Sequence, residues 1–219
     1  NMEIIDKVFD FSVVFFGILF ALFVDKLNQK RNHKKRISNI MKIVSKDLNT
    51  DLAKVNTIEE FISSRDTLYT QVINKDVMND KEIEQSMNLS TNYPKFQISN
   101  RGYNLLKDSK VDFNFKDSNL ISEIINLYDE YLEGVSSYSL YLRDNTERNF
   151  RSFMEHPWAV EFYKNKVTQG YIDYLRTNEY RAKVSFHYKF ITGPWKKILD
   201  DYQNKVLVIL KKIDKSNYR

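Results

Sequence analysis

The segment from residue 8 to residue 36 constrains the fold most, because it joins a nearly unbroken apolar run to a cluster of basic residues. Between Phe11 and Val24 the only polar side chain is that of Ser12. A bilayer core of ~30 Å needs about 20 helical residues, and the run reaches that length when it is extended back to Ile4. We therefore predict an uncleaved N-terminal transmembrane helix. One alternative is a buried core helix of a soluble domain. The other is a cleaved signal peptide, which fits less well because the chain has no basic n-region before the apolar run and no cleavage site after it.

A narrow seam of small and acidic residues runs along one side of this predicted helix. On a helical wheel of about 100° per residue, Asp6, Gly17 and Ala21 fall within about 40° of Asp10, whereas the phenylalanines lie further round. The spacing Gly17-x-x-x-Ala21 lets helix backbones approach closely. We interpret Asp10, Gly17 and Ala21 as an anchor seam for oligomers. The alternatives are a proton or ion pathway through Asp10 and an interfacial carboxylate near a helix end.

A collar of basic residues follows the apolar run, with no acidic residue inside it. Its members are Lys26, Lys30, Arg31, Lys34, Lys35 and Arg36. Lysine and arginine collect on the cytoplasmic side of membrane helices, and anionic headgroups attract them. We therefore predict a single-pass protein of the bacterial inner membrane with its C-terminal domain in the cytoplasm.

The composition of the chain narrows its possible functions. The formal net charge is +5 and six positive charges lie in the collar, so the remainder of the chain is close to neutral. A basic surface for nucleic acid is therefore not expected. The absence of cysteine excludes disulfides, thiolate nucleophiles and cysteine-ligated metals. With 5 glycines and 3 prolines in 219 residues, the composition favours helices throughout.

We expect an all-α fold in which an anchor, residues 1–36, precedes a helical domain, residues 37–219. Apolar residues recur in steps of three or four from Ile37 to Ile62, and no glycine or proline occurs between Asn28 and Pro94. The transmembrane helix is therefore expected to continue as one long helix to about Asn74. We expect this helix to pack against the C-terminal helical bundle, with a coiled coil between protomers as the alternative.

Further helices are expected along the rest of the chain, from apolar spacing and from capping residues. They cover residues 81–87, 101–108 with Ser99 as the N-cap, 119 to 143 or 154, 157–166, 171–180 and 182–215 with an interruption at residues 192–195. A brief extended segment is expected over residues 111–115. The tyrosines Tyr128, Tyr131, Tyr138 and Tyr141 are expected to fill the core, or alternatively to line an interaction groove.

Two stretches of the chain resemble a known family. They are Asp10–Leu22 with the following Asn28–Arg31, and Phe96–Ser109 with the later spacing of Leu120, Ile124 and Tyr128. They resemble a family of uncharacterised single-pass membrane proteins, frequent in Bacteroidota, whose anchor carries an acidic residue seven positions before the glycine of GI-x-x-A-L. The family commonly ends its anchor with Trp-Asn, where this chain has Leu27-Asn28. The resemblance covers residues 1 to about 130 and implies a membrane setting and an architecture, with no activity attached.

No catalytic constellation is evident in the sequence. The histidines His33, His156 and His187 lack partners at ligand spacing, and there is no phosphate-binding loop, nucleophile elbow or H-E-x-x-H motif. We therefore expect no enzyme activity, cofactor, metal or small-molecule substrate. The leading hypothesis is a membrane-anchored helical scaffold or interaction protein that self-associates through its anchor or binds a membrane-protein partner. The alternative is an oligomeric ion- or proton-conducting, or membrane-perturbing, effector that uses Asp10.

Overall fold

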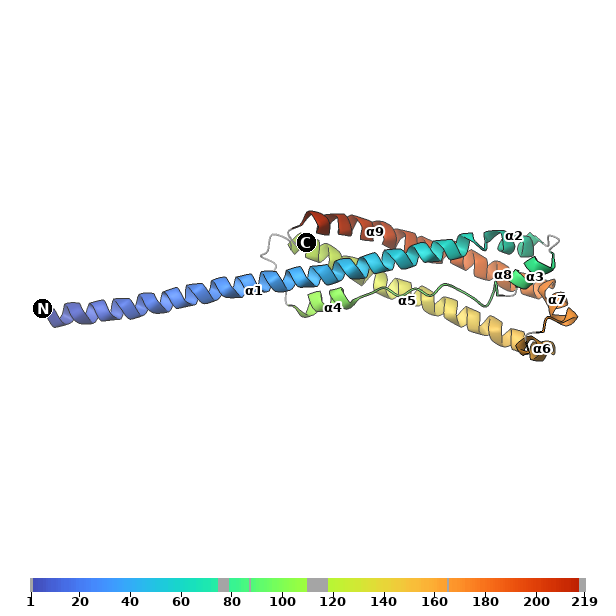
Figure 1. Ribbon diagram of the computed structural model, residues 1–219, viewed down its shortest axis with the longest axis horizontal. Coiled ribbons are helices and arrows are strands. Elements are labelled where there is room, and N and C mark those ends of the chain that lie inside the picture. Colours follow the sequence, from blue (N-terminus) through green and yellow to red (C-terminus); the bar gives the residue numbers. More distant parts are fainter. Residues whose placement is uncertain (1, 75–78, 87, 110–117, 165, 217–219) are drawn as a thin grey trace.

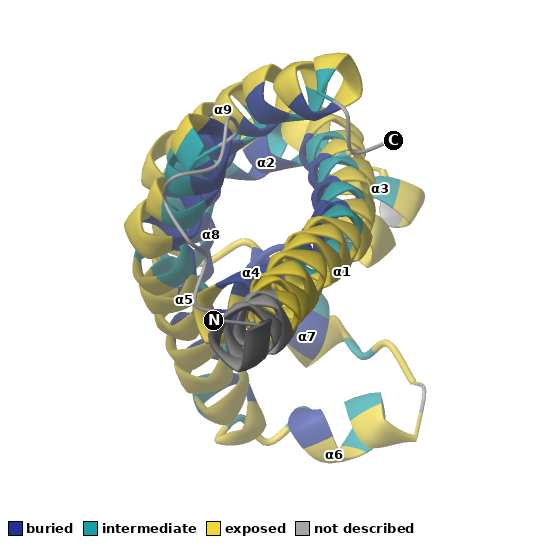
Figure 2. Cartoon of the chain, turned by 90° about the vertical axis from the view of Figure 1, so that its left-hand side faces the viewer, coloured by how far each residue is buried: buried dark blue, intermediate teal, exposed yellow. Residues whose placement is uncertain are grey.

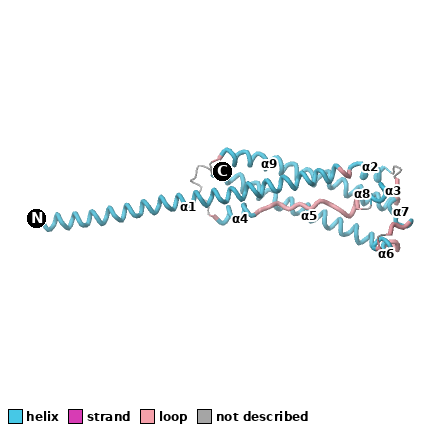
Figure 3. Tube along the Cα trace, in the orientation of Figure 1, coloured by secondary structure: helices cyan, strands magenta, loops and turns pink. Residues whose placement is uncertain are grey.

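The computed structural model describes residues 2–74, 79–86, 88–109, 118–164 and 166–216, with the backbone alone described for residues 2–12 and 80. Every regular element within these ranges is a helix, which confirms the predicted all-α class. Three long helices form the body of the molecule, namely α1 (Met2–Ser63), α5 (Ser118–Met154) and α9 (Lys196–Lys215). Residues 92–100 form an extended segment that runs back along α1 and α5 to the short helix α4 (Arg101–Asp108) (Figures 1 and 3).

Short helices gather at the end of the bundle that lies away from the N-terminus (Figure 1). They are α2 (Asp66–Asn74), α3 (Asp80–Ser86), α6 (Ala159–Tyr163), α7 (Gln169–Leu175) and α8 (Asn178–Phe190). Their buried side chains form an apolar cluster of their own, which contains Tyr69, Tyr171 and Tyr180. A π-helical turn, η1 (Ile191–Trp195), joins α8 to α9 and confirms the predicted interruption, because Pro194 has no N–H to continue the α-helical ladder.

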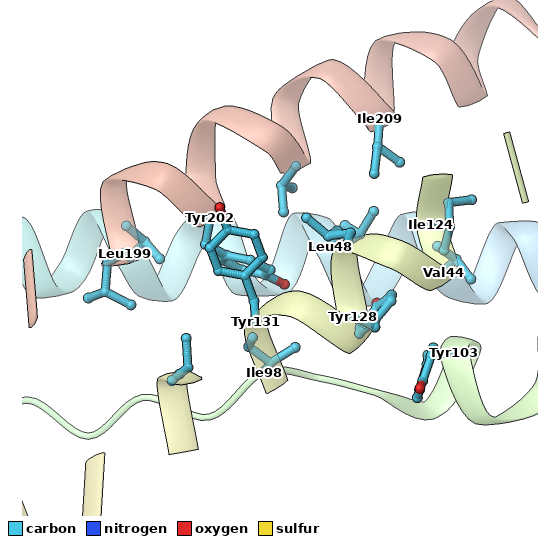
Figure 4. Close-up of a cluster of buried hydrophobic side chains, with 14 of the residues drawn as sticks. Val44, Leu48, Ile98, Tyr103, Ile124, Tyr128, Tyr131, Leu199, Tyr202 and Ile209 are labelled. Carbon is cyan, nitrogen blue, oxygen red and sulfur yellow. The ribbon is translucent and has the colours of Figure 1, made fainter. Parts of the chain in front are cut away.

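The main core lies between α1, α5 and α9, and aromatic rings fill its centre (Figure 4). Ile37 is the first residue of this core, and Val44 on the same helix is fully buried. Tyr131 of α5 meets Tyr202 of α9 with ring centroids 5.5 Å apart. Tyr128 and Tyr131 are therefore core residues, as predicted. Intramolecular packing of α1 is also confirmed, because its regular apolar stripe faces its own bundle.

Tyr138 and Tyr141 lie further along α5, at the surface. Tyr138 is half-buried and Tyr141 is exposed. Their rings pack against Phe190 of α8, with centroids 5.7 Å and 4.4 Å away. The four tyrosines thus divide between the core and a surface aromatic contact.

Several boundaries differ from the predictions. The long helix ends at Ser63 and a turn precedes α2, because the hydroxyls of Ser63 and Ser64 donate to the carbonyls of Glu59 and Phe61 and compete with the helical ladder. The helix expected over 171–180 ends at residue 175, and α8 begins four residues earlier than the predicted start at 182. The helix from residue 119 reaches the longer of its two predicted ends. The segment predicted over 111–115 lies outside the described residues.

Candidate functional site

The first part of α1 projects from the bundle as a single helix (Figure 1). Ile37 is only 2 % exposed, whereas residues 13–36 before it are exposed except for the half-buried His33. At 1.5 Å per residue this projecting segment, residues 13–36, is about 36 Å long. Figure 2 shows it end-on, with exposed residues on the sides that face the viewer.

The apolar side chains of the projecting segment point in all directions around the helix axis. Phe16 and Phe20 are each 68 % exposed, and Leu19 on another face is 46 % exposed. A helix that is apolar all round belongs in a protein core or in a membrane, and soluble monomers rarely expose contiguous apolar patches beyond a few hundred Å². Across the part of the chain that the structure describes, no helix combines the length and the apolar character needed to cross a membrane.

Two of the three predicted seam residues lie on the projecting segment. Gly17 and Ala21 are both exposed and are one helical turn apart. Apart from its chain neighbours and the backbone of its own helix, a Cβ atom at position 17 would meet no atom within 4 Å, so this face of the helix is open. At Asp10 the structure describes the helical backbone but not the side chain.

The six collar residues occupy the end of the projecting segment next to the bundle. Lys26, Lys30, Arg31, Lys34, Lys35 and Arg36 are all exposed. At about 100° per residue they are spread around most of the helix circumference, so they form a positive belt rather than a stripe. The nearest acidic residue, Asp25, accepts a hydrogen bond of 2.8 Å from the Gln29 side-chain amide. The belt therefore separates the apolar part of α1 from the bundle.

Two carboxylates on α1 fix this helix to the bundle, and we call them the α1 clamp. Asp51 is fully buried; its Oδ2 accepts from the backbone N–H of Ser99 and from the Tyr202 hydroxyl, both at 2.9 Å. Its Oδ1 accepts from the Ser99 hydroxyl at 2.7 Å. One turn earlier, Asp47 Oδ2 accepts from the N–H of Gly102 at 2.7 Å. These N–H groups lie at the start of α4, where a helix leaves donors unpaired.

The α1 clamp corrects the predicted role of Ser99. The N-cap of α4 is Asn100, which makes no side-chain capping bond, because Asp47 supplies the acceptor from another helix. Burial and the nearby carboxylates raise the pKa of Tyr202 far above its ordinary value, so the phenol remains a donor at neutral pH. A Cβ atom on Gly102 would lie 2.7 Å from the backbone nitrogen of Val44, so only glycine permits this approach of α4 to α1.

His187 forms a second buried polar site, between the extended segment, α5 and α8. Its Nε2 lies 3.0 Å from the carbonyl of Asn92, and its Nδ1 lies 3.2 Å from the side-chain nitrogen of Asn145. We assign the neutral tautomer in which Nε2–H donates to the carbonyl and Nδ1 accepts from the amide. Burial lowers the pKa of His187, so the ring is neutral at pH 7. No group of His, Asp and Glu residues within the described ranges is arranged to hold a metal ion.

Together these features define an all-α protein with a helical bundle, a projecting apolar helix and a positive belt between them. Comparisons with protein-family models, with curated proteins and with solved structures found no match to the chain.

Proposed function

We propose that the protein is a membrane-anchored helical scaffold or interaction protein, and that α1 inserts its projecting segment into a lipid bilayer. The observation that supports this most is the all-round exposure of the apolar residues next to a belt of six cations. A bilayer supplies an apolar solvent for the first and anionic headgroups for the second. In this proposal the bundle presents surfaces to partners and performs no catalysis.

The proposed anchor spans the membrane once. The helical backbone of α1 is continuous from Met2, and residues 4–24 rise about 31 Å, close to the hydrocarbon thickness of ~30 Å. Asp10 then lies in the outer half, where a carboxylate is less unfavourable than at the centre. The resemblance to single-pass proteins of Bacteroidota supports the same topology.

We further propose a bacterial inner-membrane location with the bundle in the cytoplasm, because the belt lies between the apolar segment and the bundle. Self-association of the anchor, or contact with another membrane protein, is proposed on the open face at Gly17.

Membrane fractionation tests the anchor. We expect the full chain to float with vesicles and to resist carbonate extraction, since its apolar segment is held by lipid rather than by charge. A Phe16→Asp, Phe20→Asp double variant is expected to become extractable. The matched control is Phe186→Asp, at a residue 49 % exposed on the bundle, which should remain in the membrane. Recovery of the uncleaved wild-type chain in the soluble fraction would contradict the proposal.

Proton conduction through Asp10 is the competing function, and it makes a different prediction. A conducting assembly should collapse a pH gradient across liposomes and lose this activity in Asp10→Asn. A scaffold should leave the gradient intact in both forms while remaining in the liposome fraction.

A further inference from the structure

A groove of about 600 Å³ lies between the extended segment and α5. Its apolar lining comes from both walls and includes Phe96, Ile98, Leu132 and Val135. Three cations also line it, each from a different part of the chain: Lys54 on α1, Lys95 on the extended segment and Arg143 on α5. No carboxylate belongs to the lining. The groove therefore combines an apolar floor with an excess of positive charge.

The positive charges lie toward opposite ends of the groove. The extended segment runs antiparallel to α5 (Figure 1). At one end, Lys54 Nζ lies 3.4 Å from the carbonyl of Gln97 and 3.1 Å from the Ser99 hydroxyl. Tyr93 and Arg143 both line the groove, toward its other end. Residues 93–98 of an extended chain cover about 16 Å, so the groove is elongated and carries charge at both ends.

Two of these cations are available to a ligand. Arg143 pairs with Asp144 at 3.2 Å and Glu147 at 3.8 Å, but all three side chains are more than half exposed, so these pairs are weak. Lys95 is exposed and makes no ion pair with any other described residue. Lys54 is already engaged, because its Nζ donates to the buried Asp51 at 3.3 Å as well as to Gln97 and Ser99, which uses its three N–H groups.

The size and position of the groove restrict its occupant. Pockets for small molecules commonly measure about 300–1,000 Å³ and combine apolar walls with a few polar groups. If α1 is anchored as proposed above, Lys54 lies about 45 Å along the helix from Val24. A headgroup of the same bilayer cannot reach that far, so the ligand must come from solution.

We propose that this groove binds an elongated organic anion from solution, with carboxylate or phosphate groups flanking an apolar middle. One anionic end pairs with Arg143 and Lys95, and the other lies near Lys54. The apolar middle covers the half-buried Leu132 and the exposed Leu140. This groove was not predictable from the sequence, because its three cations come from separate regions that only the fold brings together.

Calorimetric titration of the full chain with dodecanedioate tests the proposal, with the chain in nanodiscs of neutral lipid and empty nanodiscs as the blank. The same titration is done in buffer if the chain is soluble, so this test is independent of the anchor. Two probes separate the contributions: dodecane-1,12-diol keeps the apolar chain without charge, and succinate keeps two charges without the apolar middle. We expect dodecanedioate to bind at least about tenfold more tightly than either probe. The diol cannot form charge-assisted hydrogen bonds, which are roughly twice as strong as neutral ones, and succinate lacks the apolar middle.

Surface variants locate the binding. Arg143→Gln combined with Lys95→Gln should weaken dodecanedioate binding about tenfold or more, and Ser136→Trp should block the groove from an exposed position. Lys211→Gln, at an exposed position on α9 away from the groove, removes one charge as the matched control and should bind like wild type. Absence of binding to the wild type, equal binding of the diol or succinate, or unchanged binding in the groove variants would each overturn the proposal.

Discussion

Asp51 receives hydrogen bonds from two other parts of the chain, Ser99 at the end of the extended segment and Tyr202 on α9. Asp51 and Tyr202 are both fully buried, so the Tyr202 hydroxyl would have no water to replace a lost carboxylate. A buried donor left unpaired costs about 1–3 kcal/mol. This single residue therefore determines how firmly three segments are held together.

We predict that Asp51→Asn lowers the free energy of unfolding by about 1–3 kcal/mol, because the amide nitrogen cannot accept the bonds that one carboxylate oxygen accepts. Denaturant unfolding followed by circular dichroism measures the change. The matched control is Asp200→Asn, whose partner Lys196 lies at 2.7 Å on a partly exposed surface, and which should change stability by less than about 1 kcal/mol. Equal effects of the two substitutions would show that the α1 clamp is not important for stability.

His187 makes stability depend on pH near neutrality. Its native pKa lies below the ordinary value of 6.5, because burial disfavours the charged ring. On acidification the unfolded chain therefore binds a proton at His187 before the native chain does, and the free energy of unfolding falls from pH 6.5 downwards. Both hydrogen-bond partners of the ring are uncharged, and protonated Nδ1 can no longer accept from Asn145.

The test is the slope of unfolding free energy against pH between about 7.5 and 5.5, which lies above the titration of ordinary carboxylates. We expect a loss of stability on acidification in the wild type and a flatter profile in His187→Gln. The control His156→Gln replaces a half-buried histidine that stacks on Trp158, and it should keep the wild-type slope. A steep profile that survives in His187→Gln would place the proton uptake elsewhere.

At the scale of helices, apolar periodicity predicted the buried stripe of α1, because burial repeats with the helical period. The burial of Asp51 was predictable from the same stripe but was not predicted. Asp51 follows Val44 and Leu48 and precedes Val55 in steps of four, three and four, so it occupies a core position. Its partners were not predictable, since Ser99 and Tyr202 are 48 and 151 residues away. The end of α1 at Ser63 was also missed, because serine back-bonding leaves no trace in the apolar pattern.

The contact between α1 and α4 depends on the absence of a side chain at Gly102. A Cβ there would lie 2.6 Å from Val44 Cγ2 and 2.8 Å from its Cα, so the helices would have to separate. We predict that Gly102→Ala lowers the free energy of unfolding by about 1–3 kcal/mol, the usual range for overpacking. Thermal unfolding measures it, with Gly193→Ala as the control.

Gly193 is a fair comparison because a Cβ there would meet no atom within 4 Å beyond its chain neighbours and the local helix backbone. Alanine at that position should leave stability unchanged or raise it by up to about 1 kcal/mol, since glycine is the weaker helix former. If Gly102→Ala were equally harmless, α4 would not be closely packed on α1 in solution.

At the scale of the whole molecule, α1 is one helix from the apolar segment to the α1 clamp. The same rod therefore carries the proposed lipid contact, the positive belt and the two carboxylates that hold α4. The C-terminal end of α9 returns to the base of the projecting segment (Figure 1). Because the helix is continuous, whatever orients the projecting segment also orients the bundle.

If the projecting segment is the membrane anchor proposed above, self-association through it depends on which face of α1 the copies share. Lipid offers no hydrophobic drive between helices, so association requires close backbone approach, which Gly17 and Ala21 permit on one face. We predict that Gly17→Ile and Ala21→Ile reduce self-association of the full chain in detergent, measured by sedimentation equilibrium. Leu19→Ile, about 180° away from the seam at 100° per residue, changes shape without entering it and should associate like wild type. Equal behaviour of the three variants would show that the seam is accidental, and any oligomer would then form through the bundle.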